Sequence, residues 1–291
     1  MSENRVDDVT GQETTGHTWD GIEELNTPLP RWWLWTFYAT IVWGVIYVIL
    51  YPAWPLVSQA SAGVLGWSTR GNVAADIAAV EDAQSGNWQA IEAAELTAIS
   101  ADAELGPFAT RAGAALFRNN CSQCHGSGAA GALGYPNLLD DAWLWGGTVD
   151  EIAYTIRHGI RNEEDLDARW SEMPAFGEIL EEEEIASLVT HLQSFPEGVD
   201  PLAGDAGVLY ADNCAACHGD DGKGDRTLGA PNLTDAIWLY GSSTEQLTKS
   251  IAEGPFGVMP PWLGRLDEAE VRALAVYVHG LGGGEEAPAA E

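Results

Sequence analysis

The strongest constraint on this chain is a short pattern that occurs twice. Residues 120–126 read NCSQCHG and residues 213–219 read NCAACHG, at an offset of 93. A Met-Pro pair at Met173 recurs at Met259, at an offset of 86. Regular offsets of this kind indicate two homologous units of about 90 residues, one after the other.

Further matches between the two units have an offset of 95: Pro136 with Pro231, Trp143 with Trp238, and Gly159 with Gly254. The change from 95 to 86 gives the first unit nine extra residues, within the charged loop 161–169. Each unit reads as helix, cysteine motif, irregular loop, short helix, Met-Pro loop and closing helix. The closing helices are expected at 182–194 and 268–279, because acidic residues suit a helix N-terminus.

The Cys-x-x-Cys-His motif has a specific chemical meaning. Two thiols three residues apart can each add to a vinyl group of one haem. The histidine, four residues after the first cysteine, lies one helical turn on and faces the iron. One haem c is therefore predicted at Cys121, Cys124 and His125, and a second at Cys214, Cys217 and His218.

Other uses of cysteine fit less well. Zinc ribbons space their cysteine pairs by about 15 to 20 residues, whereas these pairs lie 93 apart with a histidine after each. A thioredoxin-like redox pair needs a βαβ context, and neither flank has that pattern. A disulfide scaffold is excluded, because such proteins are short and rich in cysteine, whereas this chain has four cysteines in 291 residues.

A low-spin haem needs a sixth ligand, for which methionine is the candidate. The chain has three methionines: Met1 begins it, and Met173 and Met259 occupy the same place in each unit. One methionine alone is more often a core filler, but a matched pair before proline favours thioether–iron bonds. Ligation by histidine and methionine leaves no open site, which favours electron transfer over oxygen binding. The residues themselves leave open which methionine binds which iron.

The remaining histidines are weaker candidates. His158 and His191 are not shared by the two units, and His17 belongs to the acidic N-terminal tail. His279 lies near the end of the last helix, where a cation is favourable. Of these residues, His158 is kept as a second choice for a haem ligand.

Prolines and tryptophans near the motifs indicate how the haems are held. Pro136 and Pro231 follow the ligating histidines by 11 and 13 residues. A carbonyl near such a turn is expected to accept the other imidazole N–H and so to fix the tautomer. Trp143, Trp145 and Trp238 are interpreted as walls of the haem pockets.

Arg31 and Arg70 bracket 38 residues that contain no charged side chain. The first 20 of these, residues 32–51, are enough to cross the hydrocarbon of a bilayer as a helix. Tryptophan and tyrosine gather at both ends, where aromatic rings favour the headgroup layer. A buried core helix rarely runs this long without charge, and a cleaved signal peptide would start earlier, after basic residues. A single permanent anchor is predicted at 31–57.

Haem c attachment also predicts orientation, because it takes place on the outer side of energy-transducing membranes. Residues from about 58 onward are then periplasmic, and the tail 1–30 is cytoplasmic. The Ala/Glu/Asp-rich segment 58–108 is expected to form short helices of a spacer lying against the next domain. The predicted fold is all-α, with one transmembrane helix followed by two tandem cytochrome c domains at 109–197 and 203–284.

The formal net charge is -31, from 44 acidic and 13 basic side chains. Nucleic acid is excluded as a partner, because its phosphates would be repelled. Residues 109–291 hold 30 acidic and 10 basic side chains, which would attract a basic protein such as a cytochrome c. No nucleophile–base pair or open metal site is evident, so the chain itself is not expected to catalyse bond chemistry.

Eight further segments help to identify the family. Those of the anchor region are the most specific, because two haem units alone would fit many periplasmic cytochromes. The segments are 20–22 (DGI), 30–33 (PRWW), 51–55 (YPAWP), 134–138 (GYPNL), 143–147 (WLWGG), 229–233 (GAPNL), 237–241 (IWLYG) and 277–284 (YVHGLGGG). Over nearly its whole length, the chain resembles the membrane-anchored dihaem subunit III of cbb3-type cytochrome c oxidases.

The resemblance implies a role, partners and a ligand set. Such subunits accept electrons from a soluble or anchored cytochrome c and pass them to a monohaem subunit. From there the electrons reach the catalytic haem–copper subunit of an oxygen-reducing, proton-translocating complex in the lipid of the bacterial inner membrane. The resemblance also implies crossed ligation, with Met259 on the iron of His125 and Met173 on the iron of His218.

Two other functions stay open on the residues alone. One is a stand-alone anchored dihaem carrier that serves another periplasmic redox enzyme. The other, less favoured, is a zinc-stabilised interaction module.

Overall fold

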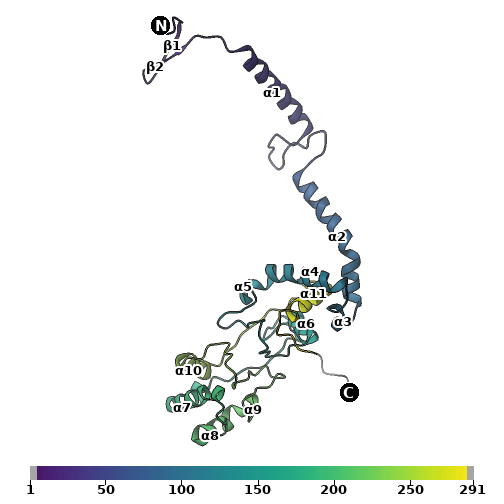
Figure 1. Cartoon of the computed structure of the whole chain (residues 1–291), viewed down its shortest axis with the longest axis vertical. Coiled ribbons are helices and arrows are strands. Elements are labelled where there is room, and N and C mark those ends of the chain that lie inside the picture. Colours follow the sequence, from purple (N-terminus) through teal and green to yellow (C-terminus); the bar gives the residue numbers. More distant parts are fainter. Residues whose placement is uncertain (1–4, 287–291) are drawn as a thin grey trace. The chain divides into compact units, whose positions relative to one another are not determined.

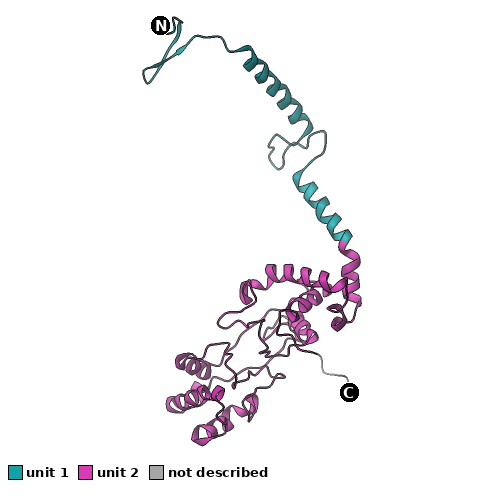
Figure 2. Cartoon of the chain, viewed as in Figure 1, with its two compact units in different colours: residues 1–83 teal, residues 84–291 magenta. Residues whose placement is uncertain are grey.

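The computed structural model describes residues 5–286. Residues 1–4, including Met1 and the start of the predicted tail, and residues 287–291 lie outside the described part. The chain divides into two compact units, up to Ala83 and from Gln84 onward (Figures 1 and 2). Each unit is described by itself below.

The N-terminal unit begins with a two-stranded antiparallel sheet, β1 (Thr14–Trp19) and β2 (Ile22–Leu25). The two residues between the strands, Asp20 and Gly21, have φ angles of 46° and 85°. Positive φ at both central residues is the backbone of a type I′ hairpin, for which Asp-Gly is a preferred sequence. This hairpin is an addition to the predicted all-α fold, which is otherwise confirmed.

The apolar helix α1 (Arg31–Leu50) has 20 residues, none of them buried. At about 1.5 Å rise per residue it is about 30 Å long, which matches the hydrocarbon thickness of a bilayer. Pro30 precedes the helix and Pro52 follows it. A helix of this length that exposes apolar side chains all round fits the predicted membrane anchor.

The prediction of short helices in the segment 58–108 is wrong for most of its length. Residues Thr69–Ala93 form one helix of 25 residues, α2, and only α3 (Leu96–Ile99) is short. Alanine and acidic residues with high helix propensity dominate α2, and no proline interrupts it. The last turns of α2 are part of a hydrophobic core and not only a spacer, because Ile91 is fully buried in the core described next.

The first core of the C-terminal unit is enclosed by α4 (Leu105–Asn120), α6 (Val149–His158) and α11 (Glu268–His279). Helix α11 approaches α4 closely at Gly113, where a Cβ atom would lie 2.3 Å from the carbonyl oxygen of Ala273. Glycine at this position is therefore what allows the two helices to touch. Figure 1 shows α11 lying among α4 and α6.

The second core is enclosed by α7 (Glu182–Gln193), α8 (Gly204–Asn213) and α10 (Thr244–Glu253). The short helices η1 (Phe176–Glu178) and η2 (Phe195–Glu197) complete it. Helix α7 closes the first repeat, yet it packs with α8 and α10 of the second. Helix α11 closes the second repeat, yet it packs with α4 and α6 of the first. The two repeats have thus exchanged their closing helices, and the boundaries 109–197 and 203–284 describe repeats of sequence whose cores are shared.

Helices α6 and α10 show how closely the repeats correspond in detail. Both have 10 residues and begin with a capping box, formed by Thr148 with Glu151 and by Ser243 with Gln246. In each helix, the cap side chain accepts the backbone N–H of the residue three positions later. The side chain of that residue accepts the backbone N–H of the cap, and the two bonds stabilise the helix start.

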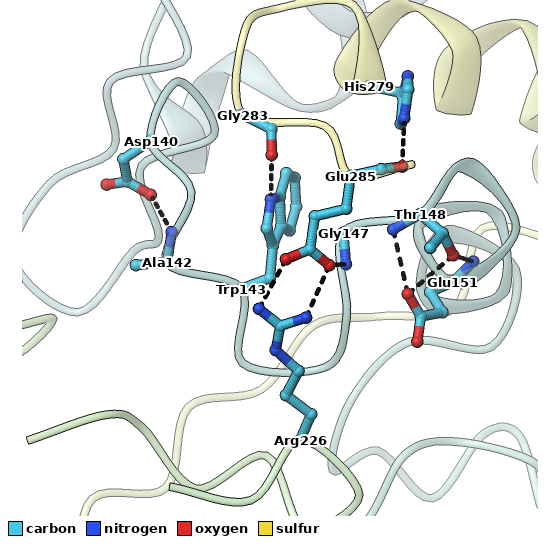
Figure 3. Close-up of polar contacts among 10 residues, drawn as sticks. All are labelled: Asp140, Ala142, Trp143, Gly147, Thr148, Glu151, Arg226, His279, Gly283 and Glu285. Carbon is cyan, nitrogen blue, oxygen red and sulfur yellow. Dashed lines mark hydrogen bonds and ion pairs between the residues drawn. The ribbon is translucent and has the colours of Figure 1, made fainter. Parts of the chain in front are cut away.

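The C-terminal strap, residues 281–286, follows α11 and returns to the first repeat (Figure 3). The Trp143 indole donates to the carbonyl oxygen of Gly283 at 2.6 Å. The Glu285 carboxylate accepts the Gly147 N–H at 2.9 Å and both Arg226 Nη atoms at 2.7 and 2.6 Å. One carboxylate thus joins the two repeats.

Candidate haem-binding sites

Each cysteine motif folds into a single helical turn. Helix α5 (Ser122–His125) and helix α9 (Ala215–His218) each follow the first cysteine of a motif directly. The backbone N–H of His125 donates to the Cys121 carbonyl at 3.0 Å, and His218 donates to Cys214 at the same distance. The thiols and the imidazole of each motif are therefore held on one turn, as haem c attachment requires.

The imidazoles are oriented by the predicted proline carbonyls. The distance from Nδ1 of His125 to the oxygen of Pro136 is 3.0 Å, and from Nδ1 of His218 to the oxygen of Pro231 it is 3.1 Å. A carbonyl only accepts, so Nδ1 carries the proton and Nε2 keeps a lone pair for a metal. The predicted role of both carbonyls is confirmed.

Burial acts in the same direction on both histidines. It lowers the pKa of His125 and of His218, because surroundings poor in water disfavour the imidazolium form. The neutral form, which binds metals, is therefore stabilised at both sites.

The cysteines fit haem better than zinc. All four thiols are free, with Cys124 and Cys217 exposed. Burial raises the pKa of Cys121 and of Cys214 to about 11. Zinc binds thiolates, so thiols held neutral in this way are poor zinc ligands. Addition to haem vinyl groups consumes the S–H groups and leaves no charge to bury.

The two methionines lie across the repeats. Met259 packs against the first core, as Cys121 does, and Met173 packs against the second core with Cys214. Gly159 at the end of α6 would place a Cβ atom 2.4 Å from the Met259 carbonyl oxygen. Gly254 at the end of α10 would place one 2.3 Å from the Met173 carbonyl oxygen. Each methionine loop thus docks on the helix end of the other repeat.

The predicted tryptophan walls are found in two environments. Trp143 packs against the first core and Trp238 against the second. Trp145 is only 6% exposed yet belongs to neither core. Its ring lies against Gly229 of the second repeat, where a Cβ atom would be 2.3 Å from ring carbons. In the equivalent place, Tyr240 lies against Gly134 of the first repeat.

The other histidines have partners of their own. His158 Nδ1 lies 2.9 Å from an oxygen of Asp165, and its ring contacts the Tyr154 ring in a tilted arrangement, with the centroids 4.5 Å apart. His191 Nε2 is 2.8 Å from the Pro201 oxygen, and His279 Nε2 is 2.9 Å from the Glu285 backbone oxygen. In His191 and His279 the occupied nitrogen is Nε2, the one that a haem ligand offers to the iron, whereas His158 is bonded through Nδ1, as His125 and His218 are. His17 is exposed on β1 of the N-terminal unit.

Two arginines near Trp145 were not predicted as site residues. Arg161 and Arg169 come from the nine-residue insertion, and both guanidinium groups lie over the Trp145 ring. The insertion was visible in the sequence as a change of offset, but only the fold brings its two ends to one indole.

The residues present therefore fit haem c at two places: oriented imidazoles, free thiols and a thioether beside each core. Family comparison agrees. Residues 108–192 and 202–278 match the model described as cytochrome c oxidase, cbb3-type, subunit III. Residues 11–58 match the N-terminal domain of cytochrome oxidase-cbb3, FixP. The chain belongs to the subunit III family of cbb3-type cytochrome c oxidases.

Curated relatives are similar along nearly their full length. A cbb3-type cytochrome c oxidase subunit CcoP of Cereibacter sphaeroides is 56% identical over 276 residues, covering 94% of this chain and 95% of the relative. A subunit FixP of Sinorhizobium medicae is 50% identical over 282 residues, covering 96% and 98%. A FixP of Rhizobium meliloti is 49% identical with the same coverage.

Membership of this family decides between the alternatives. The chain carries two haem c groups, and its role is electron transfer within a cbb3-type oxidase. A stand-alone carrier is not favoured, because the anchor region matches the oxidase family as well as the haem repeats do.

Proposed function

We propose that this chain is the electron entry subunit of its oxidase. It accepts electrons from a periplasmic cytochrome c and passes them to a monohaem subunit, from which they reach the haem–copper centre. The observation that carries this proposal is the joining of two haem sites in one compact unit, in a chain of the oxidase family. Two haems held by shared cores keep a fixed separation, which a relay needs.

The sixth ligands are proposed to be crossed, with Met259 on the iron of His125 and Met173 on the iron of His218. Support comes from the packing of each methionine against the core that holds the cysteines of the other repeat. The backbone of Met259 also pairs with Ile160 of the first repeat through two hydrogen bonds of 2.9 and 3.0 Å.

Chains with a single haem test this pairing. With Cys121 and Cys124 changed to alanine, only the second haem remains. Met173→Leu should then abolish the charge-transfer absorption of methionine-ligated ferric haem, and Met259→Leu should leave it. The reverse result would show ligation within each repeat. The complementary Cys214/Cys217 variant repeats the measurement on the first haem.

The proposed orientation places the haem repeats in the periplasm and the N-terminal tail in the cytoplasm, with α1 as a single anchor. The exposed apolar surface of α1 supports the anchor. The side on which haem c is attached supports the orientation. A reporter enzyme that is active only outside the cytoplasm should work when fused after residue 286 and fail when fused before α1.

The proposed donor is a basic cytochrome c. Residues 109–291 hold 30 acidic and 10 basic side chains, a field that steers a basic partner and is screened by salt. No single acidic cluster is assigned as its docking site.

The function is tested on the purified oxidase complex with and without this subunit. Loss of the subunit should slow the oxidation of reduced cytochrome c. Oxygen reduction from a small artificial reductant that reaches the haem–copper centre directly should continue. An unchanged rate with cytochrome c would contradict the proposal, as would purification in mild detergent without any other oxidase subunit.

A further inference from the structure

Trp145 holds a polar atom that the fold leaves unsatisfied. The side chain is 6% exposed, and its indole N–H has no hydrogen-bond partner among residues 5–286. Trp143, two positions earlier, donates its own N–H to Gly283. Buried donors are paired in most native proteins, so an orphan N–H in a closed place points to a partner that is not part of the polypeptide.

Two positive charges lie close to the same indole ring. The guanidinium carbon of Arg161 is 6.0 Å from the ring centroid, and that of Arg169 is 5.5 Å from it. Both residues belong to the insertion 161–169, which the second repeat lacks. The first repeat thus supplies two cations at the Trp145 ring, and the second repeat has no arginines equivalent to them.

Neither guanidinium meets a carboxylate in an ion pair within the described part of the chain. Arg161 donates to the backbone oxygens of Ser171 at 2.5 Å and Gly257 at 3.1 Å. Arg169 donates to Thr155 Oγ1 at 3.0 Å and to the Glu151 backbone oxygen at 3.5 Å. All four acceptors are uncharged.

Charged groups on the neighbouring elements do not change this picture. Glu172 and Tyr240 lie near Arg161, and Glu151 and Tyr154 near Arg169, close enough to favour the charged guanidinium. Burial outweighs them and lowers the pKa of both arginines. An anion at this place would relieve that cost and would also accept the Trp145 N–H.

The haem attached to the chain supplies such an anion. Haem c carries two propionate carboxylates, and a carboxylate is the group that an arginine fork and an indole N–H both bind. The loops around Arg161 indicate which haem. Ile160, next to Arg161, pairs with Met259, and Met259 packs against the first core with Cys121. Ser171 and Gly257, which both accept from Arg161, lie two residues before Met173 and Met259, so the pairing of Ile160 with Met259 is what assigns the first haem.

We propose that Arg161 and the Trp145 indole N–H bind a propionate of the first haem at the contact between the two repeats, with Arg169 as a second positive charge beside it. The choice of haem rests on the haem placement proposed above. Cations held near an iron disfavour its ferric state, so this arrangement raises the reduction potential of the first haem. The second repeat has Tyr240 in the place of Trp145 and no inserted arginines, so the two haems differ in potential.

The test is a spectroelectrochemical titration of the full chain in detergent. Arg161→Gln should weaken the reduction of the first haem about tenfold, which is about 59 mV for one electron, and should leave the second haem near its original midpoint. Single-haem variants assign the midpoints. Arg265→Gln is the matched control, because Arg265 also lies over a tryptophan, at 5.6 Å from the Trp262 ring centroid, but is exposed. It should shift neither midpoint.

Trp145→Phe separates a bound propionate from a general charge effect, because it removes the N–H and keeps an aromatic side chain and the net charge. The first midpoint should fall by less than in Arg161→Gln. It should also become dependent on pH and rise as the pH falls, since a propionate that has lost a donor protonates more readily. An unchanged midpoint in Trp145→Phe, or equal shifts of both haems in Arg161→Gln, would overturn the proposal.

Haem content keeps this test distinct from the test of function. A pyridine haemochrome assay of the Arg161, Trp145 and Arg265 variants should give two haems per chain, whatever the midpoints are. Where Arg161→Gln does not retain both haems, Arg161→Lys takes its place, because it keeps the charge and loses the fork. A smaller fall of the first midpoint is then expected, and no change would overturn the assignment.

Discussion

The two haem sites are alike in what holds the haem and unlike in what surrounds it. Both have a motif on one helical turn, an imidazole bonded to a proline carbonyl, and a methionine loop against the glycine at the end of a capped helix. Only the first repeat supplies a tryptophan, Trp145, with two arginines over its ring. The comparison teaches that attachment and ligation are repeated, whereas the electrostatic environment of the haem is not.

The largest expected loss of stability comes from substitutions in the two exchanged closing helices. Leu274 in α11 and Leu188 in α7 hold the same place in the two repeats, and both are fully buried. Replacing either by alanine should cost about 2–5 kcal/mol of unfolding free energy, because a cavity opens in a core. Thermal unfolding measures the loss.

The location of the damage is the sharper part of this prediction. Leu274→Ala should disturb the absorption of the first haem, although the residue belongs to the second repeat, and Leu188→Ala should disturb the second haem. Disturbance of the haem in the same repeat would show that the closing helices are not exchanged.

Gly159→Ala and Gly254→Ala are expected to have the next largest effect on stability. Both glycines have positive φ, 73° and 69°, and both would place a Cβ atom within 2.4 Å of a methionine carbonyl. Each substitution should cost about 1 kcal/mol or more from backbone strain alone, and should displace the methionine loop. Loss of the methionine–iron absorption from one haem checks it. Gly128→Ala, with no atom within 4 Å of its Cβ position, should leave both haems unchanged.

The strap contact has a smaller expected effect, and it joins Gly147 of the first repeat to Arg226 of the second. Glu285→Gln removes the charge that joins Arg226 to the Gly147 N–H. Because Arg226 is about half exposed, the loss should be about 0.5–1 kcal/mol and should shrink in high salt. Chemical unfolding at low and high salt measures it. Glu164→Gln, which loses the exposed pair with Arg265, should have less effect, and an equal loss would argue against the strap as a clamp.

The smallest expected difference concerns acid. Both ligating histidines have a pKa below the ordinary value of 6.5, so the folded chain binds their protons less readily than the unfolded chain does. Their contribution to stability is complete above pH 6.5 and is lost as the pH falls toward the lowered pKa. An acid titration of the Soret absorption should show both haems losing ligation below pH 6.5, at similar midpoints. Widely separated midpoints would show that the two histidines are not equivalently buried.

Local features of the fold were predictable from the sequence, and long-range ones were not. The proline carbonyls were predicted correctly because they lie 11 and 13 residues from their histidines, within one loop. The exchange of α7 and α11 has no signature in the offsets, since equivalent helices present equivalent faces to either core. The β1–β2 hairpin was missed although Asp20-Gly21 is a turn signal.

Two further differences have physical causes. Separate clusters of helix formers predict short helices, whereas α2 runs for 25 residues, because no proline interrupts Thr69–Ala93. The positions of Arg161 and Arg169 depend on the docking of the inserted loop against Trp145, which no local pattern encodes.

The exchanged closing helices also determine an order of assembly. Every residue of the second core lies before α11, between Met173 and Ala252, whereas the first core needs α11 up to Val278. A chain that leaves the ribosome from its N-terminus therefore completes the second core first, the reverse of the usual order for successive domains. Its first haem motif is made earliest, yet the core against which Cys121 packs is completed last, so Cys121 stays accessible to the attachment machinery for longer than Cys214.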